Sequence, residues 1–329
     1  MSGSVGSRIA VIGGAGFIGG HFVDRLLGRP AVEQVTVYDN FTSGREWHLA
    51  HHADDPRLVI VRGEVADLDL LTASLAGHHT AIHLASNPDI AKAMTDPTVD
   101  FHEGTALTHS VTEACRRAGV SLVLYASGSG VYGDLGDVPA FEDLGPLVPV
   151  STYGASKLAG EALLCSYSYM FGSRALAFRF ANVVGPRQTH GVGFDFVRRL
   201  LADPSRLDVL GDGSQSKSYI HVSDVIDAVL FAAENAPDEP FGVFNVGTGD
   251  YITVREIAEL AIDVVGLGRP SVEVAYGTSD RGWKGDVPVV RIATDRINDL
   301  GWTCSRSTAT ALRESLVSML EDAKAGRLT

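Results

Sequence analysis

Short apolar runs rich in β-branched residues alternate with helical patterns through the first half of the chain. The runs that predict buried strands occupy residues 8–14, 34–40, 58–64, 80–86, 121–127 and 175–185. Between them, residues 17–28, residues 105–119 and the stretch after Tyr153 carry apolar side chains at helical spacing. Helices that alternate with almost continuously apolar strands are typical of a parallel sheet covered on both faces. We therefore predict an α/β fold with a doubly wound parallel sheet.

The pattern changes after about residue 185, where helices and short strands mix. Turn-forming clusters such as GDGSQS (211–216) and GTGDY (247–251) interrupt this part of the chain. We expect residues 1–182 to form the domain built on the parallel sheet. Residues 183–329 are expected to form a smaller C-terminal α/β lobe that binds substrate. The boundary is soft, because segments of the second part can return to the first.

Composition and charge exclude several classes of partner. The net charge is −13, which argues against non-specific binding to nucleic acid or to anionic membranes. Cys115, Cys165 and Cys304 are far apart and have neither a disulfide framework nor metal-ligand spacing. The N-terminal segment lacks a signal-peptide core, and no apolar run is long enough to span a bilayer. We expect a cytoplasmic protein with no metal site.

A glycine pattern lies between the first predicted strand and the first predicted helix. The sequence GGAGFIG contains glycines at three-residue intervals, Gly13, Gly16 and Gly19. They allow a tight turn and bring a dinucleotide pyrophosphate close to the helix N-terminus. Asp39 ends the second predicted strand, where a carboxylate binds ribose hydroxyls and repels a 2′-phosphate. Because Asn40 and Phe41 offer no cation for that phosphate, we predict a Rossmann domain that binds NAD in preference to NADP.

Further motifs accompany the glycine pattern in a fixed order. They are DNxxSG (39–44), HLAS (83–86), VYG (131–133), YxxxK (153–157) and YIHVSD (219–224). Together they resemble the extended short-chain dehydrogenase/reductases, and most closely the nucleotide-sugar epimerase/dehydratase group typified by UDP-glucose 4-epimerase. The segments FANVVGPR (180–187), LGDGSQSKSYIHV (210–222) and DRGWKGDVP (280–288) are similar to the archaeal-type branch of the 4-epimerases.

The resemblance implies a tightly held NAD, regenerated in each turnover, and a nucleoside-diphosphate sugar, with a UDP-sugar favoured, bound between the lobes. At matching motif positions it implies further cofactor contacts from Phe17, Ile18, Asn40, Ser43, Gly44, Glu64, Val65, Leu84, Ala85, Ser86, Ser127 and Phe180. It implies contacts with the nucleotide diphosphate from Asn182, Lys217, Tyr219, Arg281 and Asp286. Lys217 stands where the family commonly has arginine, so a point charge replaces a planar fork.

The same resemblance implies a homodimer paired through the helices that cover about 103–118 and 153–171. In this chain ALLCSYSYMFG (162–172) offers apolar and aromatic side chains that suit such a contact, although they suit a core position equally well.

Tyr153 and Lys157 lie four residues apart and therefore share one face of a predicted helix. A free tyrosine titrates near pH ~10. A nearby ammonium and the positive nicotinamide of NAD both favour the phenolate. Tyr153 can then take a proton from a sugar hydroxyl while hydride leaves the same carbon for NAD. Lys157 is also expected to hold the nicotinamide ribose.

The motif ASGSGVYG (126–133) departs from the family pattern. Aligned on VYG, the usual catalytic Ser/Thr falls on Gly128, and the acidic pair of the dehydratases falls on Ser129 and Gly130. The glutamate of the decarboxylases also falls on Gly130. Without a carboxyl group, elimination lacks its acid/base partner, which argues against both reactions. Epimerisation at C4 needs only Tyr153 as base and then acid, and we expect Ser129, Ser127 or a water molecule to replace the missing hydroxyl.

Two more departures concern the space around the substrate. Val290 follows Asp286 by four residues, where some family members carry a tyrosine that limits the C2 substituent, so an N-acetyl group is expected to fit. Gly104 stands where the family usually has asparagine, which removes a polar group near the cofactor.

We therefore expect an NAD-dependent 4-epimerase of a nucleoside-diphosphate sugar, acting on UDP-glucose and UDP-galactose or on a modified or N-acetylated hexose. Two alternatives stay open. One is an oxidoreductase that forms a keto-sugar, and the other is a weakly catalytic nucleotide-sugar-binding protein.

Overall fold

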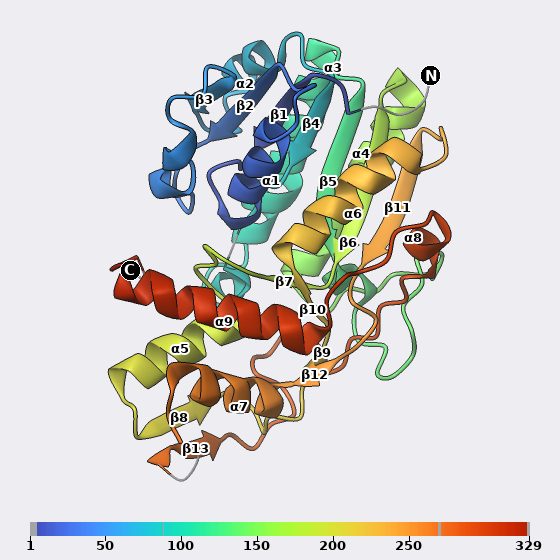
Figure 1. Ribbon diagram of the computed structural model, residues 1–329. Coiled ribbons are helices and arrows are strands. Elements are labelled where there is room, and N and C mark those ends of the chain that lie inside the picture. The colour runs from blue at the N-terminus through green and yellow to red at the C-terminus, as the bar shows by residue number, and fades with distance from the viewer. Residues whose placement is uncertain (1–4, 88, 269–270, 328–329) are drawn as a thin grey trace.

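The computed structural model describes residues 5–87, 89–268 and 271–327, and its largest element is a seven-stranded parallel sheet (Figure 1). The order of the strands is β11-β6-β5-β4-β1-β2-β3. Their bounds are β1 (Arg8–Ile12), β2 (Gln34–Asp39), β3 (Leu58–Arg62), β4 (Thr80–His83), β5 (Leu122–Gly128), β6 (Arg174–Phe180) and β11 (Phe241–Val246). The order reverses between β1 and β4, so the predicted doubly wound Rossmann sheet is confirmed.

Helices cover both faces of the sheet. α1 (Phe17–Leu27) and α6 (Val222–Asn235) pack together on one face (Figure 1). The other face is covered by α2 (Leu68–Leu75), α3 (Leu107–Ala118) and α4 (Thr152–Phe171). Among the described residues, no helix has the length and apolar character needed to cross a membrane.

Large buried side chains fill both layers between sheet and helices. Phe22 and Phe178 belong to the core on the side of α1 and α6, and Tyr38 and Tyr125 to the core on the other side. All four are among the largest fully buried side chains of the protein. Removing a side chain of this size from water contributes about 1.5–3 kcal/mol, so these layers supply much of the stability of the sheet.

Some predicted boundaries are wrong for identifiable reasons. The single strand predicted over 175–185 divides at Ala181 into β6 and β7 (Asn182–Val184). The Ala181 N–H still bonds to the Val246 carbonyl at the sheet edge (2.9 Å), but β7 leaves the sheet to pair with β10 (Tyr219–His221). The helix predicted over 105–119 begins only at α3, because the π-helical turn η4 (Phe101–Ala106) precedes it.

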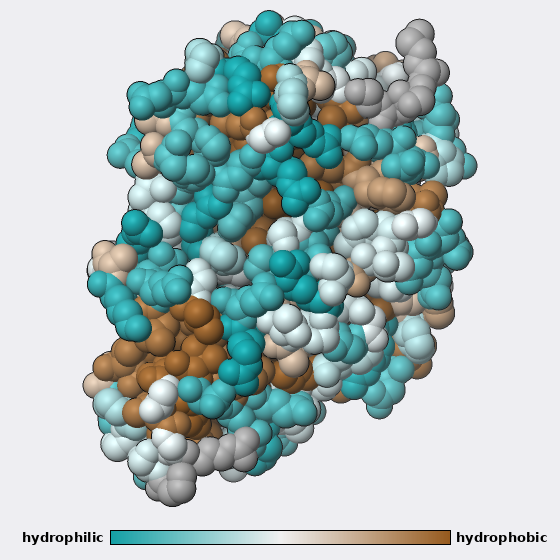
Figure 2. All heavy atoms as spheres, viewed as in Figure 1, coloured by the Kyte–Doolittle hydropathy of each residue, from teal (hydrophilic) through white to brown (hydrophobic). Residues whose placement is uncertain are grey.

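A smaller group of helices and short strands packs around a hydrophobic core of its own, below the sheet in Figure 1. With β7 and β10 it contains α5 (Val192–Ala202), β8 (Arg206–Val209), β9 (Ser216–Lys217), β12 (Ile252–Thr253), α7 (Val254–Val265), β13 (Glu273–Tyr276) and α9 (Thr308–Lys324). Figure 2 shows apolar residues gathering over α5 on this part of the surface. The later elements α6, β11 and the short α8 (Asp295–Asp299) lie with the sheet instead.

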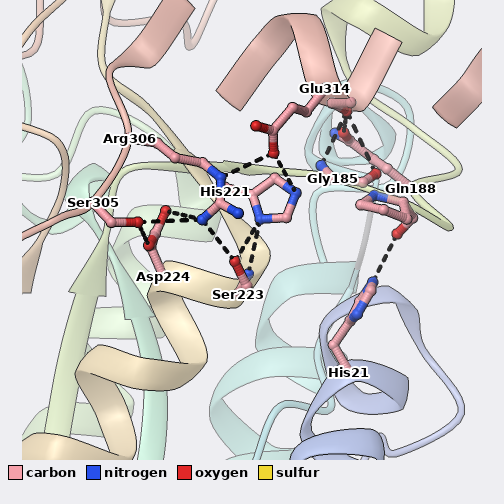
Figure 3. A network of polar contacts seen from close by, with 11 residues as sticks. His21, Gly185, Gln188, His221, Ser223, Asp224, Ser305, Arg306 and Glu314 are labelled. Atoms are coloured by element: carbon pink, nitrogen blue, oxygen red, sulfur yellow. Dashed lines mark hydrogen bonds and ion pairs between the residues drawn. The ribbon is translucent and has the colours of Figure 1, made fainter. Parts of the chain in front are cut away.

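A polar network ties this smaller group to the sheet (Figure 3). His221 Nδ1 caps α6 by accepting from the Ser223 N–H (3.2 Å). Asp224, in the first turn of α6, accepts from Arg306 (3.0 Å), and Arg306 Nε donates to Glu314 on α9 (2.9 Å). The Asp224 carboxylate is buried, and a buried charge needs a partner. The network therefore holds α9 against α6.

Candidate active site

The turn between β1 and α1 has the shape that a dinucleotide pyrophosphate requires. Gly13 has a φ of 83°, and a Cβ there would lie 2.8 Å from Ala85 N. A Cβ on Gly19 would lie 2.2 Å from the Gly13 carbonyl oxygen, so only glycine fits at either position. Gly16 is the N-cap of α1, and none of the described side chains caps the first turn, which carries Phe17 and Ile18. The backbone N–H groups of the first turn of α1 are therefore free to bind an anion.

Asp39 holds this turn from the end of β2. Its two carboxylate oxygens accept from the backbone N–H groups of Ala15 (2.9 Å) and Phe41 (2.8 Å). Burial raises the pKa of Asp39, against the opposing effect of these two N–H groups. Phe41 has a φ of 60°, and a Cβ on Gly44 would lie 2.9 Å from Asp39 Oδ1. The segment after β2 is thus folded tightly against the glycine turn.

A cation that no sequence motif indicated lies beside Asp39. Arg62 stands opposite Asp39 in the β2–β3 register, and its guanidinium lies 4.2 Å from the centre of the Phe41 ring. Strand register between β2 and β3 would have revealed this neighbour. Arg62 also pairs with Glu46 (2.8 Å), which offsets its charge. Asp39 therefore remains the charged group of this corner that can repel a 2′-phosphate.

The remaining cofactor candidates lie around the same turn or on its flanks. The N–H groups of Leu84 and Ala85 both bond to the Ile12 carbonyl (2.9 and 3.0 Å), which ends β4 beside the glycines. Asn40 donates to Glu64 (3.0 Å). Val65 is buried in the turn between β3 and α2, Phe180 is buried at the end of β6, and Ser43 is exposed.

Ser86 provides a test of whether these residues fit NAD. Its hydroxyl oxygen is buried and has no hydrogen-bond partner among the described residues. A buried hydroxyl without a partner is costly, so this atom fits a polar ligand that lies along the end of β4. Together with the glycine turn and the uncapped start of α1, it fits the cofactor.

Tyr153 and Lys157 are carried by α4, whose N-cap Ser151 accepts from the Gly154 N–H (3.1 Å). Lys157 is buried, donates to the Ala126 carbonyl (2.9 Å) and has its Nζ 5.5 Å from the centre of the Tyr153 ring. Desolvation raises the pKa of Tyr153 to about 12. Burial also lowers the pKa of Lys157 to about 8. The protein alone thus keeps the phenol protonated, and a positive cofactor ring would have to favour the phenolate.

A buried carboxylate that no motif indicated lies near this pair. Asp100 is 1% exposed and accepts from Thr152 Oγ1 (2.6 Å) and Asn87 Nδ2 (3.0 Å). Its negative charge contributes to the raised pKa of Tyr153. The contact with Thr152 anchors the start of α4 to the residue that precedes η4.

Gly104 has a steric role here. A Cβ on Gly104 would lie 2.6 Å from the Ser156 hydroxyl oxygen, so its absence lets α4 approach η4 closely. The missing asparagine side chain is thus matched by closer packing of two elements rather than by open space.

The two serine candidates in the segment 126–133 have different surroundings. β5 ends at Gly128 and a 3₁₀ turn, η5 (Ser129–Tyr132), follows. Ser127 is buried and its hydroxyl donates to Glu161 (2.5 Å), so its proton is directed to this carboxylate. The Ser129 hydroxyl is half-buried and makes no side-chain hydrogen bond to any described residue. A Cβ on Gly128 would meet nothing within 4 Å, so space remains at that position.

Glu161 is the centre of a buried network below this segment. It forms a two-point ion pair with Arg179 on β6, with N–O distances of 2.7 and 3.0 Å. Burial opposes the charge of Arg179, but the hydrogen bonds that Arg179 donates to Glu161 raise the pKa of Arg179. Arg179 also donates to the Tyr132 hydroxyl (2.9 Å), which donates to Asn245 on β11 (2.8 Å). The network links four elements around the end of β5.

The substrate candidates gather around β9 and β10. Lys217 pairs with Asp286, and Arg281 donates to the Asp286 carbonyl (2.6 Å). Tyr219 lies opposite Asn182 in the β10–β7 register. Burial raises the pKa of Tyr219. Polar contacts connect Lys217, Asp286 and Arg281, and Tyr219 and Asn182 lie on the adjoining pair of strands; these five residues are called the polar wall below.

Two contacts extend this wall towards the rest of the site. The Val290 N–H bonds to the Ser216 carbonyl (3.3 Å), which places Val290 beside β9. Arg281 also pairs with Asp134 (2.6 Å), which follows η5 closely in the chain. The polar wall is thus joined to the loop that follows η5.

One grouping of possible metal ligands occurs among the described residues, at Asp24, His51 and His52. The two imidazole Nε2 atoms lie 2.8 and 2.9 Å from the same Asp24 oxygen, and Arg187 pairs with the other oxygen. Hydrogen bonds and the arginine charge account for this cluster. The expected absence of a metal stays a prediction.

Comparisons with known proteins agree with this geometry. Residues 9–247 match the NAD dependent epimerase/dehydratase family. The chain is 35% identical over 266 residues to the UDP-glucose 4-epimerase of Mycolicibacterium smegmatis, which covers 79% of this chain and 83% of that protein. A crystal structure of a UDP-galactose 4-epimerase has a TM-score of 0.85 and 36% identity, covering 96% of this chain and 99% of that chain. The structure of a double mutant of DesIV, the dTDP-glucose 4,6-dehydratase of Streptomyces venezuelae, was solved with NAD and DAU bound. It has a TM-score of 0.87 and 27% identity, and the match covers 98% of this chain and 100% of that chain.

Replacing Lys157 by methionine tests the cost of the buried ammonium. Between a folded pKa of about 8 and the ordinary 10.5, the unfolded chain binds more protons, so wild-type stability rises with pH in this window. Without cofactor, we expect the free energy of unfolding of Lys157→Met to be about 2 kcal/mol larger than that of wild type at pH 7. Most of this difference should disappear by pH ~10. Urea unfolding at both pH values measures this, and an advantage that does not change with pH would contradict it.

Replacing Glu161 by glutamine tests the buried ion pair, because Arg179 would then lack its countercharge. We expect a loss of about 3–5 kcal/mol in the free energy of unfolding. The double variant Glu161→Gln, Arg179→Met should recover much of this loss, since no charge then remains unpaired. Urea unfolding compares the three proteins, and a single variant within ~1 kcal/mol of wild type would show that the pair is not the support described here.

Proposed function

The chain belongs to the NAD dependent epimerase/dehydratase family, and within it we propose that the protein is a nucleotide-sugar 4-epimerase acting through a transient 4-keto sugar. The observation that carries the proposal is the pairing of Tyr153 and Lys157 on α4 beside a segment that has no carboxylate at positions 129 and 130. Two buried carboxylates lie nearby, but both oxygens of Asp100 accept, from Asn87 and Thr152. Glu161 is held as a charged carboxylate by Arg179 and accepts from Ser127. Elimination of a hydroxyl would lack an available acid.

When bound, NAD supplies a reversible acceptor for the hydride on the sugar carbon. Tyr153 takes the proton of the sugar hydroxyl in the forward step and returns it in the reverse step. Lys157 stabilises the phenolate, and its short bond to the Ala126 carbonyl fixes the ammonium in place. The open space at Gly128 leaves room for the keto sugar to turn over before hydride returns to its other face.

Ser129 is the residue that we assign to the missing Ser/Thr. Its hydroxyl has no partner among the described side chains, whereas that of Ser127 is bound to Glu161. A hydroxyl here can hold the reacting oxygen and relay its proton.

The polar wall at β9 and β10 is the proposed nucleotide site. Lys217 and Arg281 supply charge for the diphosphate, and Asn182, Tyr219 and Asp286 shape its surroundings. Val290 stands at the sugar end of this wall, where its small side chain admits an N-acetyl group. We propose a UDP-sugar as substrate, with a plain or N-acetylated hexose.

A homodimer is part of the proposal, because the C-terminal turn of α4 exposes large apolar side chains. Tyr169, Met170 and Phe171 are 69%, 72% and 50% exposed. Burying such residues across a two-fold axis removes an unfavourable apolar surface. We expect Met170→Glu to convert a dimer into a monomer in sedimentation experiments, and a wild-type monomer at micromolar concentration would contradict the assembly.

The proposed activity is tested with a panel of UDP-, dTDP- and GDP-sugars, including N-acetylated hexoses. Product stereochemistry and nicotinamide absorbance are followed together. We expect a C4 epimer without net NADH. Stoichiometric NADH would indicate an oxidoreductase instead, and tight binding without turnover would indicate a binding protein. Complete rejection of N-acetylated sugars would refute the proposal that the small side chain of Val290 admits an N-acetyl group.

Ser129→Ala tests the replacement of the missing hydroxyl. We expect kcat to fall well over tenfold, in the range of about 10²–10⁴ that acid–base groups contribute. Because a Cβ on Gly128 meets nothing within 4 Å, the double variant Gly128→Ser, Ser129→Ala should fold normally and recover part of the lost rate. A near-wild-type kcat for the single variant would leave a water molecule as the better explanation.

A further inference from the structure

Four residues of alternating charge, Lys217, Asp286, Arg281 and Asp134, are joined by successive polar contacts along the polar wall, and one of these contacts is made by a backbone carbonyl. Lys217 on β9 pairs with one oxygen of Asp286. Arg281 donates from one nitrogen to the Asp286 carbonyl (2.6 Å) and from another to the Asp134 carboxylate (2.6 Å). Asp134 lies two residues beyond η5. The series therefore runs from the proposed diphosphate ligands to the segment next to the proposed catalytic serine.

The two carboxylates of this series differ in how firmly they are held. Asp286 is 7% exposed, and its second oxygen accepts from the Gly282 N–H (3.0 Å). The Asp134 side chain is 32% exposed, and its second oxygen only closes a turn of its own loop through the Gly136 N–H (3.2 Å). Ion pairs exposed to this degree contribute little to stability, so the contact between Asp134 and Arg281 can open at small cost.

Charge balance requires one of these contacts to open. Lys217 and Arg281 already face two carboxylates, and a diphosphate adds at least two more negative charges. The Arg281 guanidinium can bind phosphate oxygens through two parallel hydrogen bonds, which are stronger than a single contact with a carboxylate. A guanidinium stays protonated at neutral pH, so Arg281 keeps its full charge whether it contacts Asp134 or a phosphate.

We propose that Asp134 competes with the diphosphate of the nucleotide for Arg281, so that binding and release exchange one anion for the other at this guanidinium. The inference rests on the proposed function, which assigns Arg281 to the diphosphate. In the absence of nucleotide, Asp134 holds the loop after η5 against the segment that carries Arg281. Nucleotide binding frees this loop, and its return helps to expel the product.

Asp137 provides a matched control for this competition. It lies on the same loop and carries the same charge, but it faces Arg291 at 3.5 Å and is 88% exposed. Asp134→Asn and Asp137→Asn each remove one negative charge from the loop. They therefore have the same long-range effect on an anionic ligand and differ in the direct contact with Arg281.

The experiment is calorimetric titration of the NAD-loaded wild type and both variants with UDP, and with UMP as the ligand that lacks a second phosphate. For Asp134→Asn we expect UDP to bind about two- to fivefold more tightly than to wild type, with a smaller change for UMP. For Asp137→Asn we expect a change below about 1.5-fold. The advantage of Asp134→Asn should shrink in high salt, because partly exposed charges are screened.

Equal or weaker UDP binding by Asp134→Asn, relative to Asp137→Asn, would overturn the competition while leaving the proposed function intact. An equal gain in both variants would also overturn it, since the effect would then come from net charge alone. Failure of UDP to bind to any of the three proteins would overturn the proposed function itself, and the competition with it.

Discussion

The site depends on the attachment of α4 to the end of β5. Three residues one turn apart on α4, Tyr153, Lys157 and Glu161, face this strand end. Lys157 binds the carbonyl of Ala126, and Glu161 binds the hydroxyl of the next residue, Ser127. Two successive residues of the strand are thus fixed by two successive turns of the helix. The distance between the tyrosine and the segment after the strand follows from these contacts.

The buried ion pair between Glu161 and Arg179 makes this attachment costly to distort. Loss of either partner would leave an unpaired charge in the interior. Substitutions at neighbouring positions outside this ion pair are therefore tolerated more easily than substitutions of Glu161 or Arg179. Three such positions are Gly128 at the end of β5, Gly130 in η5 and Gly104 in η4 beside α4. At Gly128 the structure leaves space, whereas at Gly104 a closer approach of helices takes the place of the side chain. Substrate specificity can therefore vary without loss of the tyrosine–lysine pair.

The parts of this arrangement that depend on local spacing could be predicted from the sequence. The glycine turn, Asp39 at the end of β2 and the shared face of Tyr153 and Lys157 each follow from residues close together in the chain. The parts that depend on tertiary packing could not. Strand alternation would place Ser127 and Ser129 on one face, but β5 ends at Gly128 and only Ser129 is left free.

Arg62, Asp100 and the seventh strand, β11, were missed for the same reason. Arg62 reaches Asp39 through strand register, and Asp100 reaches α4 through a contact between distant segments. β11 joins the sheet beside β6 after a long excursion of the chain through the smaller group of elements. Neither hydrophobic periodicity nor motif spacing carries such information.

In the proposed reaction, hydride leaves C4 of the sugar and returns to C4 without release of the intermediate. A UDP-hexose with deuterium at C4, incubated with the NAD-loaded protein, tests it most directly through the position of the label in the product. We expect a C4 epimer that keeps its deuterium at C4, with no deuterium in released nicotinamide. Deuterium at C6 of a dehydrated sugar, or in free NADH beside a released keto-sugar, would contradict it.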